Sequence, residues 1–438
     1  MSKSDPNHLN DPNDPYDPYP DAEPQFAQPP LKAKKGRGAV SNLQGRYEVL
    51  TREHIDDGWS GAHMDANTDA NMDDDPASPE TAAQTGEQPG TGPDTDGAST
   101  WKTLVIEEHA KSILSRNRSP DVPFTISLNP YRGCEHGCIY CFARPTHSYL
   151  GLSPGLDFES KIFAKVNAPE LLRQELAKAS HVPEPIALGV NTDAYQPCER
   201  ELRLTRRLLE VLNECQHPVA LITKSSLIER DIDLLAEMAS RRLAMAAVTL
   251  TTLDSQVART LEPRATAPMR RLRTIRALTD AGIPVGVSIA PVIPFVTEPD
   301  LERILAAAVE AGAVNAGYVT LRLPWEVSPL FRQWLEAHFP DRAARVMNRV
   351  RDIHGGKDYD SSFGKRMHGE GIWADLIRQR FEKTVARLGI GVRSGRFQGL
   401  DTSLFRRPST PVAPQRTKLE LKKKSGEKPN PGGQFELF

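Results

Sequence analysis

Short apolar runs alternate with longer amphipathic stretches along the chain from residue 124 onward. Runs of five or six apolar or β-branched residues bounded by turn residues are typical of buried strands. The pattern predicts strands at 124–128, 186–190, 219–223, 245–250, 284–289 and 316–321. A helical stretch follows each strand, and several of these helices open with proline or an acidic residue, as helix N-termini prefer. The helices are predicted to begin near Pro169, Glu201, Ile228, Pro268, Pro299 and Val327.

The alternation of strand and helix predicts a parallel sheet with right-handed crossovers. Six such units suit a partial (β/α)6 barrel, although an open doubly wound sheet would show the same pattern. A barrel carries its functional residues at the carboxyl ends of its strands. Polar residues do follow the strands: NTDAYQPC at 191–198 follows the second strand, and Lys224, Ser225 and Ser226 follow the third.

The last part of the predicted core, from Asp352 to Arg393, has a different pattern. A turn-rich stretch, GGKDYDSSFGKRMHGEG, precedes one more helix, in which Ile372, Leu376 and Ile377 are expected to face inward. We expect this segment to cap one end of the barrel. The barrel and its cap then occupy residues 101–400.

The two ends of the chain differ from this core in composition. Residues 51–100 carry twelve Asp and Glu against a single Arg, with few aliphatic residues, so most of 1–100 is expected to be disordered. Aromatic and aliphatic residues reappear at 36–59 and could dock on the core. Residues 401–438 form a basic, flexible tail, which would either attract phosphate groups or act as a solvated linker.

No apolar run is long enough to span a membrane, and the polar start MSKSDPNHLN is unlike a secretion signal. The protein is therefore expected to be cytoplasmic. Five cysteines, three of them clustered, suit a reducing compartment better than a disulfide framework.

The clustered cysteines, Cys134, Cys138 and Cys141, form a C-x-x-x-C-x-x-C motif directly after the first predicted strand. Three thiolates can bind three irons of an iron-sulfur cube and leave the fourth iron open. A structural zinc site is the alternative, and it would need a fourth ligand such as His136 or Cys198. The position of the cysteine loop favours the barrel over the doubly wound sheet.

This motif resembles that of the radical SAM superfamily, and the region 100–395 resembles its spore photoproduct lyase-like or DNA-repair-photolyase-like branch. The resemblance implies a 4Fe-4S cluster that reductively cleaves S-adenosylmethionine to a 5′-deoxyadenosyl radical. It places the ring of Tyr140 against the adenine, with Phe142 beside the last cysteine. A late cysteine that donates a hydrogen atom in spore photoproduct lyase has no counterpart here, because no cysteine follows Cys215.

The same resemblance implies roles for residues at the strand ends. Thr192 and Asp193 would hold the methionyl group, and Lys224 would bind the carboxylate. Thr249 or Thr251 would meet the ribose or the methionyl group, while the sequences around Glu262, Pro263 and Pro291 also resemble the branch. Taken singly, these residues could equally be turn residues, a solvated helix start or strand fillers.

The function predicted from the resemblance is a lyase-like radical enzyme acting on nucleic acid, as in DNA repair, with an electron donor such as flavodoxin or ferredoxin. The alternatives are radical modification of RNA, protein or a small molecule, and a non-catalytic iron-sulfur or zinc protein that binds nucleic acid. Substrate-facing candidates, for which packing at the rim is the alternative role, are Tyr195, Tyr318, Arg322, Trp325 and Tyr359.

The chain ends in GGQFELF, where Gln434, Leu437 and Phe438 form Q-x-x-L-F. This resembles the peptides with which bacterial repair and replication proteins bind the sliding clamp. A short motif is weak by itself, but apolar anchors at the end of a long polar stretch suit a docking peptide. Folding back on the barrel is the alternative.

Overall fold

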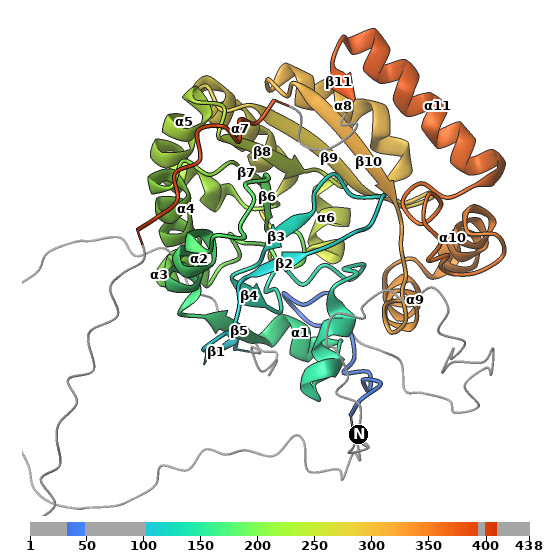
Figure 1. The fold of residues 1–438 in the computed structure, drawn as a ribbon. Helices are drawn as coiled ribbons and strands as arrows, with labels where there is room; N and C mark the ends of the chain where they lie inside the picture. The colour runs from blue at the N-terminus through green and yellow to red at the C-terminus, as the bar shows by residue number, and fades with distance from the viewer. Residues whose placement is uncertain (1–32, 49–101, 393–398, 410–438) are drawn as a thin grey trace, which may run out of the picture.

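The computed structural model describes residues 33–48, 102–392 and 399–409 (Figure 1). The predictions for residues 49–59 and for the clamp peptide at 434–438 lie outside these residues. No helix in the described ranges is long and apolar enough to cross a lipid bilayer.

The larger of two sheets has eight strands in the order β11-β10-β9-β8-β7-β6-β3-β2. All neighbours in this sheet pair in parallel except β2 and β3, which are antiparallel. The strands are β2 Leu114–Arg116, β3 Ile126–Leu128, β6 Ile186–Leu188, β7 Val219–Thr223, β8 Ala244–Thr249, β9 Val285–Val292, β10 Asn315–Thr320 and β11 Gly391–Val392. The six predicted strands correspond to β3 and β6 to β10, so the α/β fold with a parallel sheet is confirmed.

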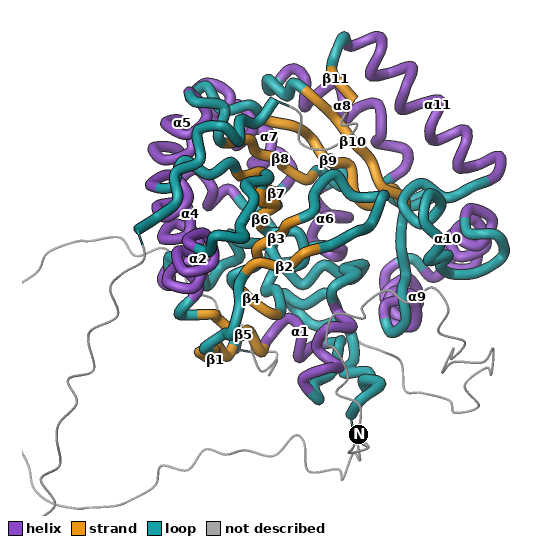
Figure 2. Tube along the Cα trace, viewed as in Figure 1, coloured by secondary structure: helices purple, strands orange, loops and turns teal. Residues whose placement is uncertain are grey.

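Helices cover the outer face of this sheet, with at least one between each pair of successive parallel strands (Figure 2). The helices are α2 Ala168–Ala177, α3 Glu199–Leu202, α4 Leu204–Glu214, η2 Ser226–Asp231, α5 Ile232–Ser240, α6 Ser255–Leu261, α7 Pro268–Asp280, η3 Glu298–Asp300, α8 Leu301–Glu310, α9 Val327–His338, α10 Pro340–Ile353 and α11 Gly371–Leu388. The predicted helix starts agree with α2, α3, η2, α7, η3 and α9. The sequence pattern missed α6 and α10.

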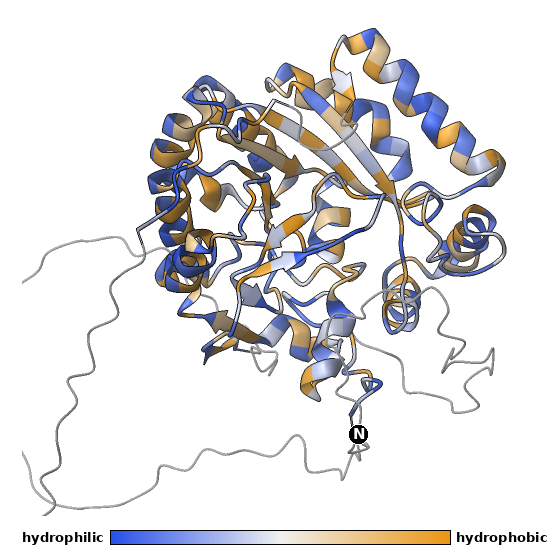
Figure 3. Ribbon diagram, viewed as in Figure 1, coloured by the Kyte–Doolittle hydropathy of each residue, from blue (hydrophilic) through white to orange (hydrophobic). Residues whose placement is uncertain are grey.

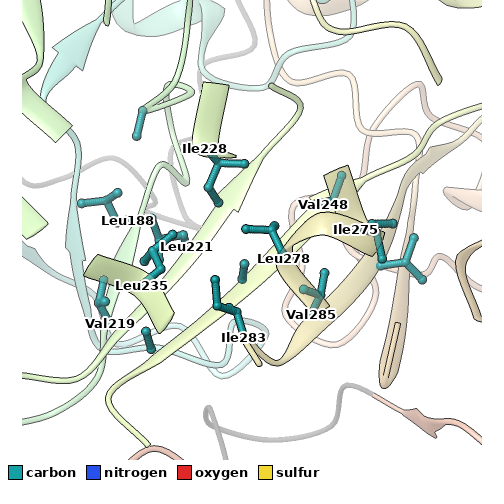
Figure 4. Packing of buried hydrophobic residues seen from close by; sticks show 14 of the residues in the cluster. Leu188, Val219, Leu221, Ile228, Leu235, Val248, Ile275, Leu278, Ile283 and Val285 are labelled. Atoms are coloured by element: carbon teal, nitrogen blue, oxygen red, sulfur yellow. The ribbon is translucent and has the colours of Figure 1, made fainter. Parts of the chain in front are cut away.

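The main core lies between the sheet and these outer helices. Apolar side chains of β6, β7, β8 and β9 pack there against η2, α5 and α7 (Figure 4). Almost every residue of β3 and of β6 to β9 is buried, whereas the outer helices carry both apolar and polar residues (Figure 3). Burial of both faces is characteristic of parallel sheets, and it explains why the strands appear in the sequence as continuous apolar runs.

A second sheet, which the sequence analysis missed, has three strands in the order β1-β5-β4. Two short helices, η1 and α1, lie beside it in the chain. The pattern in β1 is mostly exposed, so hydrophobic periodicity could not reveal it. The elements are β1 Leu104–Glu108, β4 Tyr131–Arg132, η1 Arg144–Leu150, α1 Leu156–Ser160 and β5 Lys161–Lys165.

The prediction for the last helix needs correction. Ile377 is fully buried, but Ile372 is 90% exposed and Leu376 is 41% exposed. The buried side of α11 is formed by Ala374, Ile377, Phe381 and Val385. α11 packs along α8, where Arg380 pairs with Glu302 at 2.7 Å, so it lies next to the outer helix layer.

The turn-rich segment before α11 instead links the two edges of the sheet. Its residue Arg366 pairs with Asp121, between β2 and β3, at 2.7 Å, and both side chains are more than nine-tenths buried. The Gly364 amide donates a second hydrogen bond to Asp121. On the other side, the Thr320 amide at the end of β10 donates to Met367 O. This segment thus connects the β2–β3 loop with the end of β10 through side-chain and backbone contacts, where the described strands do not pair with each other.

Residues 399–409 lie on the outer surface of the barrel. Phe405 packs against His181 and His217 with ring centroids 5.3 Å away in each case, and the Arg406 amide donates to Cys215 O. The sequence analysis placed residues 401–438 in a flexible tail, whereas the part described by the structure makes these packing contacts.

Candidate metal and cofactor site

The three clustered cysteines lie on the loop between β4 and η1, beyond the carboxyl end of β3. Cys134 and Cys138 are buried, and Cys141 is partly buried. Turns fold the loop on itself: the Gly137 amide donates to Cys134 O, and the Cys141 amide donates to Cys138 O. All three side chains therefore belong to one compact loop.

The protein environment disfavours the thiolate form of two of these cysteines, Cys134 and Cys138. Burial raises the pKa of Cys138 to about 12. Burial, together with the charges of Asp193 and the neighbouring cysteines, raises the pKa of Cys134 well above its ordinary value. Metal binding deprotonates a thiol and stabilises the thiolate, so a bound metal would relieve this unfavourable desolvation.

The underside of the cysteine loop rests on a buried ion pair. Arg144 and Glu159 pair with no exposure of either side chain. Arg144 also donates from Nε to Cys138 O at 2.9 Å and from Nη2 to Gly137 O at 3.1 Å. This arginine fixes two carbonyl groups of the loop, so the position of Cys138 depends directly on it.

The N-terminal segment 33–48 contacts the same ion pair. Glu159 accepts hydrogen bonds from the amides of Gly38 at 3.0 Å and Ala39 at 2.8 Å. A Cβ at Gly38 would lie 1.8 Å from Gly137 O, so only glycine allows this close approach to the cysteine loop. Segment 33–48 lies beside α1 (Figure 1). It forms part of the site although it is distant in sequence from the cysteine loop.

A second carboxylate, Glu135, holds the loop from the side of β6. Its backbone amide donates to the Gln196 side chain at 2.9 Å, and its carboxylate accepts from the Cys198 amide at 2.6 Å. Arg264, which follows α6, pairs with Glu135 at 3.0 Å. The cysteine loop is thus tied to two of the loops that follow barrel strands.

Asp193, directly after β6, is a third carboxylate connected to the loop. It accepts hydrogen bonds from Thr223 Oγ1 and the Lys224 amide, both at 2.7 Å, and from the Tyr195 amide at 2.9 Å. His136 Nδ1 lies 3.3 Å from Oδ2 of the same carboxylate. Burial opposes ionisation, but His136 and these donors outweigh it and lower the pKa of Asp193 to about 2.

Glu262, after α6, organises the opposite side of the site. It pairs with Arg271 and accepts hydrogen bonds from the Tyr140 hydroxyl and from Thr251 Oγ1. Burial raises its pKa, but Arg271, Lys224 and the two hydroxyl groups prevail and lower it to about 2. The phenol of Tyr140 is thereby fixed next to the cluster cysteines.

Lys224 lies between the two carboxylate networks. Its ammonium is 5.8 Å from the centre of the Tyr140 ring, and it forms no ion pair with any carboxylate in the described part of the chain. Burial opposes its charge, but the negative charge of a Cys138 thiolate and of Glu262 raises the pKa of Lys224 above its ordinary value. It is therefore a charged ammonium with hydrogen-bonding capacity left for a ligand.

The other expected cofactor residues differ in whether their side chains already form hydrogen bonds within the protein. Thr192 donates from Oγ1 to Tyr131 O at 3.0 Å, and Thr251 donates to Glu262. Thr249, at the end of β8, is buried, and its hydroxyl forms no side-chain hydrogen bond to another described residue. Phe142 is 42% exposed, and the Arg322 guanidinium lies 4.8 Å from its ring centre.

The ligands considered for a zinc site have other partners. His136 faces Asp193, and Cys198 lies against Glu135. Within residues 33–48, 102–392 and 399–409, no three His, Cys, Asp or Glu side chains form a group that could hold a single metal ion. An iron-sulfur cluster does not need its ligands to surround a single ion, because each cysteine binds a different iron. Three thiols on one loop suit such a cluster.

The supporting residues Arg144 and Glu159 were not recognised in the sequence. Both are buried charges, and only their position within the folded protein distinguishes them from surface residues. The one available signal was the pair of glycines at 36 and 38, at the start of the segment 36–59 that was expected to dock on the core. A glycine in such a segment can mark close backbone contact.

Comparisons with known proteins identify the superfamily to which the chain belongs. The sequence profile of the radical SAM superfamily matches residues 128–308, which include the cysteine loop and the strands β4 to β9. An uncharacterized protein of Mycobacterium tuberculosis is 36% identical over 235 residues, covering 53% of this chain and 68% of the relative. An uncharacterized protein of Methanocaldococcus jannaschii is 25% identical over 249 residues, covering 57% and 89%.

The chain therefore belongs to the radical SAM superfamily. Among solved structures, it is similar to spore photoproduct lyase complexed with dinucleoside spore photoproduct, with 15% identity, a TM-score of 0.47 and coverage of 66% of this chain and 82% of that one. It is also similar to Streptococcus suis SuiB bound to S-adenosylmethionine, with 11% identity, a TM-score of 0.30 and coverage of 50% and 43%. Family membership implies a radical SAM enzyme that uses a 4Fe-4S cluster and S-adenosylmethionine.

Proposed function

We propose that Cys134, Cys138 and Cys141 hold a 4Fe-4S cluster and that the protein uses it to act on nucleic acid. When bound, the cluster supplies the electron that splits S-adenosylmethionine into methionine and a 5′-deoxyadenosyl radical. The observation that carries the proposal is the cysteine loop itself, which brings three thiols together on one turn, with Cys138 close enough to Lys224 for their charges to interact.

The residues around the loop divide into two groups by their remaining hydrogen-bonding capacity. Lys224 and Thr249 have donors available, so Lys224 would bind the methionine carboxylate and Thr249 would meet the ribose or the methionyl group. Thr192, Asp193 and Thr251 are already bonded within the protein. Their proposed contribution to cofactor binding is to hold the strand-end loops around the cofactor, and any contact with it would be an additional hydrogen bond.

Tyr140 would present one ring face to the adenine. Its hydroxyl is bound to Glu262, so the ring cannot rotate away without breaking a buried hydrogen bond. Phe142 lies further out, next to Arg322. The exposed ring of Phe142 is placed to contact the outer part of the cofactor or the substrate.

The proposed substrate class is nucleic acid, with a lyase-like or repair-like reaction, because the chain resembles the spore photoproduct lyase branch in its motifs. Flavodoxin or ferredoxin would deliver the electron. The Q-x-x-L-F peptide at Gln434, Leu437 and Phe438 would bring the enzyme to the sliding clamp. Modification of RNA, protein or a small molecule would use the same cofactor site and a different substrate.

The test is anaerobic reconstitution with iron and sulfide, followed by reduction in the presence of S-adenosylmethionine. We expect iron binding and formation of 5′-deoxyadenosine, with more product when irradiated DNA is added. The Lys224→Met variant should bind the cluster but form little product, because it lacks the ammonium. Zinc without iron, or no cleavage after full reconstitution, would contradict the proposal.

A further inference from the structure

The exposed aromatic rings of the described residues are not scattered over the surface. They are Tyr47, Phe142, Tyr149, Trp325 and Phe363, each between 40% and 52% exposed. They come from five separate segments. Ring stacking and contacts with arginine guanidinium groups join them into one series, which includes Phe142 of the cysteine loop. We call this series the aromatic strip.

The first half of the strip joins the N-terminal segment, η1 and the loop after β10. Tyr47 stacks on Tyr149 with ring centroids 5.0 Å apart. The Arg46 guanidinium lies 5.6 Å from the Tyr47 ring and 4.2 Å from the Trp325 ring. Arg46 thus holds two rings of the strip by cation–π contacts.

The second half begins in the same loop after β10 and reaches the cysteine loop. Arg322 lies 4.8 Å from the ring of Phe142, the residue directly after Cys141. Nη1 of Arg322 donates to the Met367 thioether at 3.1 Å. Arg366, the residue before that methionine, lies 4.8 Å from the Phe363 ring. The strip therefore passes the cluster cysteines and continues onto the segment that bridges the sheet edges.

Two features indicate that the strip is built for a ligand and not for the core. Trp325 has a φ of +47°, which is unfavourable for a bulky residue, and its ring is nevertheless 40% exposed. Arg322 is largely buried and hydrogen-bonds Tyr359, but its Nε has no hydrogen-bond partner, and it forms no ion pair with a carboxylate among the described residues. A phosphate would satisfy such a guanidinium.

The strip is also held rigidly in place. Glu326 is fully buried and accepts hydrogen bonds from Arg46 Nε at 2.9 Å and from Ser148 Oγ at 3.3 Å. These two residues precede Tyr47 and Tyr149, and Glu326 follows Trp325. One carboxylate therefore fixes the backbone beside three rings, which keeps them at defined positions before any ligand arrives.

We propose that the aromatic strip binds a single-stranded segment of nucleic acid, with unpaired bases stacked on Tyr149 and Trp325 and a phosphate at Arg322. Exposed rings interleaved with arginines form the platform on which unpaired bases stack. The strand would then lead its reactive nucleotide to the cysteine loop at Phe142. This inference rests on the proposed function and specifies its substrate as unpaired DNA or RNA.

The experiment measures fluorescence anisotropy with the full-length, anaerobically reconstituted protein. The probes are labelled oligodeoxythymidine and oligouridine of about 15 nucleotides and a duplex of equal length. Trp325→Ala and Tyr149→Ala should each weaken binding of the single strands about 10-fold, while Trp325→Phe restores most of the affinity. The matched controls Val182→Ala and Met269→Ala, at side chains that are 60% and 61% exposed, should bind as the wild type does.

The two oligonucleotides distinguish DNA from RNA as the source of the unpaired bases. Trp325→Gly removes the ring without backbone strain and should match Trp325→Ala, which excludes misfolding as the cause. Stronger binding of the duplex, or unchanged binding by the alanine variants, would overturn the inference. Formation of 5′-deoxyadenosine without nucleic acid is measured in parallel, so failure of the strip is distinguished from failure of cofactor cleavage.

Discussion

The barrel sheet and the cysteine loop are held in place by opposite kinds of interaction. Between the strands and the outer helices, aliphatic side chains such as Leu188, Leu221 and Ile275 pack together without charge. Around the cysteine loop, buried carboxylates at Glu135, Glu159, Asp193 and Glu262 bind arginines, amides and hydroxyl groups. The first region derives its stability from burial of apolar area, and the second derives its shape from directional bonds.

The difference shows how the two regions respond to change. Apolar packing tolerates substitutions of similar volume, because it is not directional. A buried charge network does not, because removal of one partner leaves the other unsatisfied. We therefore expect core variants to lose stability while retaining the cluster, and loop variants to lose the cluster disproportionately.

The largest effect is expected from the cluster cysteines. Cys134→Ala, Cys138→Ala or Cys141→Ala should abolish cluster assembly, because each removes one of three protein ligands, while the barrel remains folded. Iron content and the visible absorbance of the reconstituted protein measure the loss, and far-UV circular dichroism measures the fold. Cys215→Ala is the control, because Cys215 belongs to the apolar core, and a similar loss of iron in this variant would contradict the assignment.

Glu159→Ala is the next strongest test, because it leaves Arg144 buried without its partner. Loss of one member of a buried pair costs roughly 3–5 kcal/mol, which urea unfolding would detect, and iron incorporation should fall as Arg144 releases the loop carbonyls. Glu214→Ala breaks the exposed pair with Arg173 and should cost less than about 1 kcal/mol. Equal effects of the two variants would refute a special role for the Glu159 pair.

A variant in the apolar core is expected to lose stability without losing iron. Leu188→Ala in β6 removes a fully buried side chain and should destabilise the protein by about 2–5 kcal/mol. The iron bound per folded molecule should stay at the wild-type value below the unfolding transition. A cluster defect in this variant without unfolding would show that the two regions are coupled more closely than their contacts imply.

The smallest effect concerns pH. Because the pKa of Glu262 is about 2 in the folded protein against an ordinary value of 4.5, its contribution to stability is present above about pH 5 and is lost as pH falls toward 2. Urea midpoints of the wild type and Glu262→Gln should therefore differ most near pH 7 and converge at low pH. A difference independent of pH would contradict this account.

The regular part of the protein could be predicted from its sequence. Parallel strands buried on both faces appear as continuous apolar runs, so β3 and β6 to β10 were located to within a few residues. The three cysteines could also be recognised from the sequence, because their spacing lies within one loop, and their role as cluster ligands stays a prediction. Family membership confirms the class of chemistry that this spacing indicated.

Other features could not be predicted, for physical reasons. In the small sheet β1 is mostly exposed, and β4 and β5 bury only Tyr131, Ile162 and Ala164. In α11 the neighbouring apolar residues Ile372 and Leu376 obscured the buried face at Ala374, Ile377 and Phe381. The partners of Arg144 and Glu262 lie on distant segments, and sequence alone does not show which charged residues become buried. The roles of Thr192, Asp193, Lys224, Thr249 and Thr251 in cofactor binding remain predictions.

The contact between Gly38 and Gly137 affects how the enzyme can be divided. A protein that begins at residue 101 would contain every cysteine and every strand of the larger sheet, and by sequence coverage it would look like an intact catalytic unit. It would lack the backbone amides that neutralise Glu159 beneath the cysteine loop. We therefore expect the fragment that begins at residue 101 to incorporate less iron, and the N-terminal piece, supplied as a separate peptide, to restore what truncation removes.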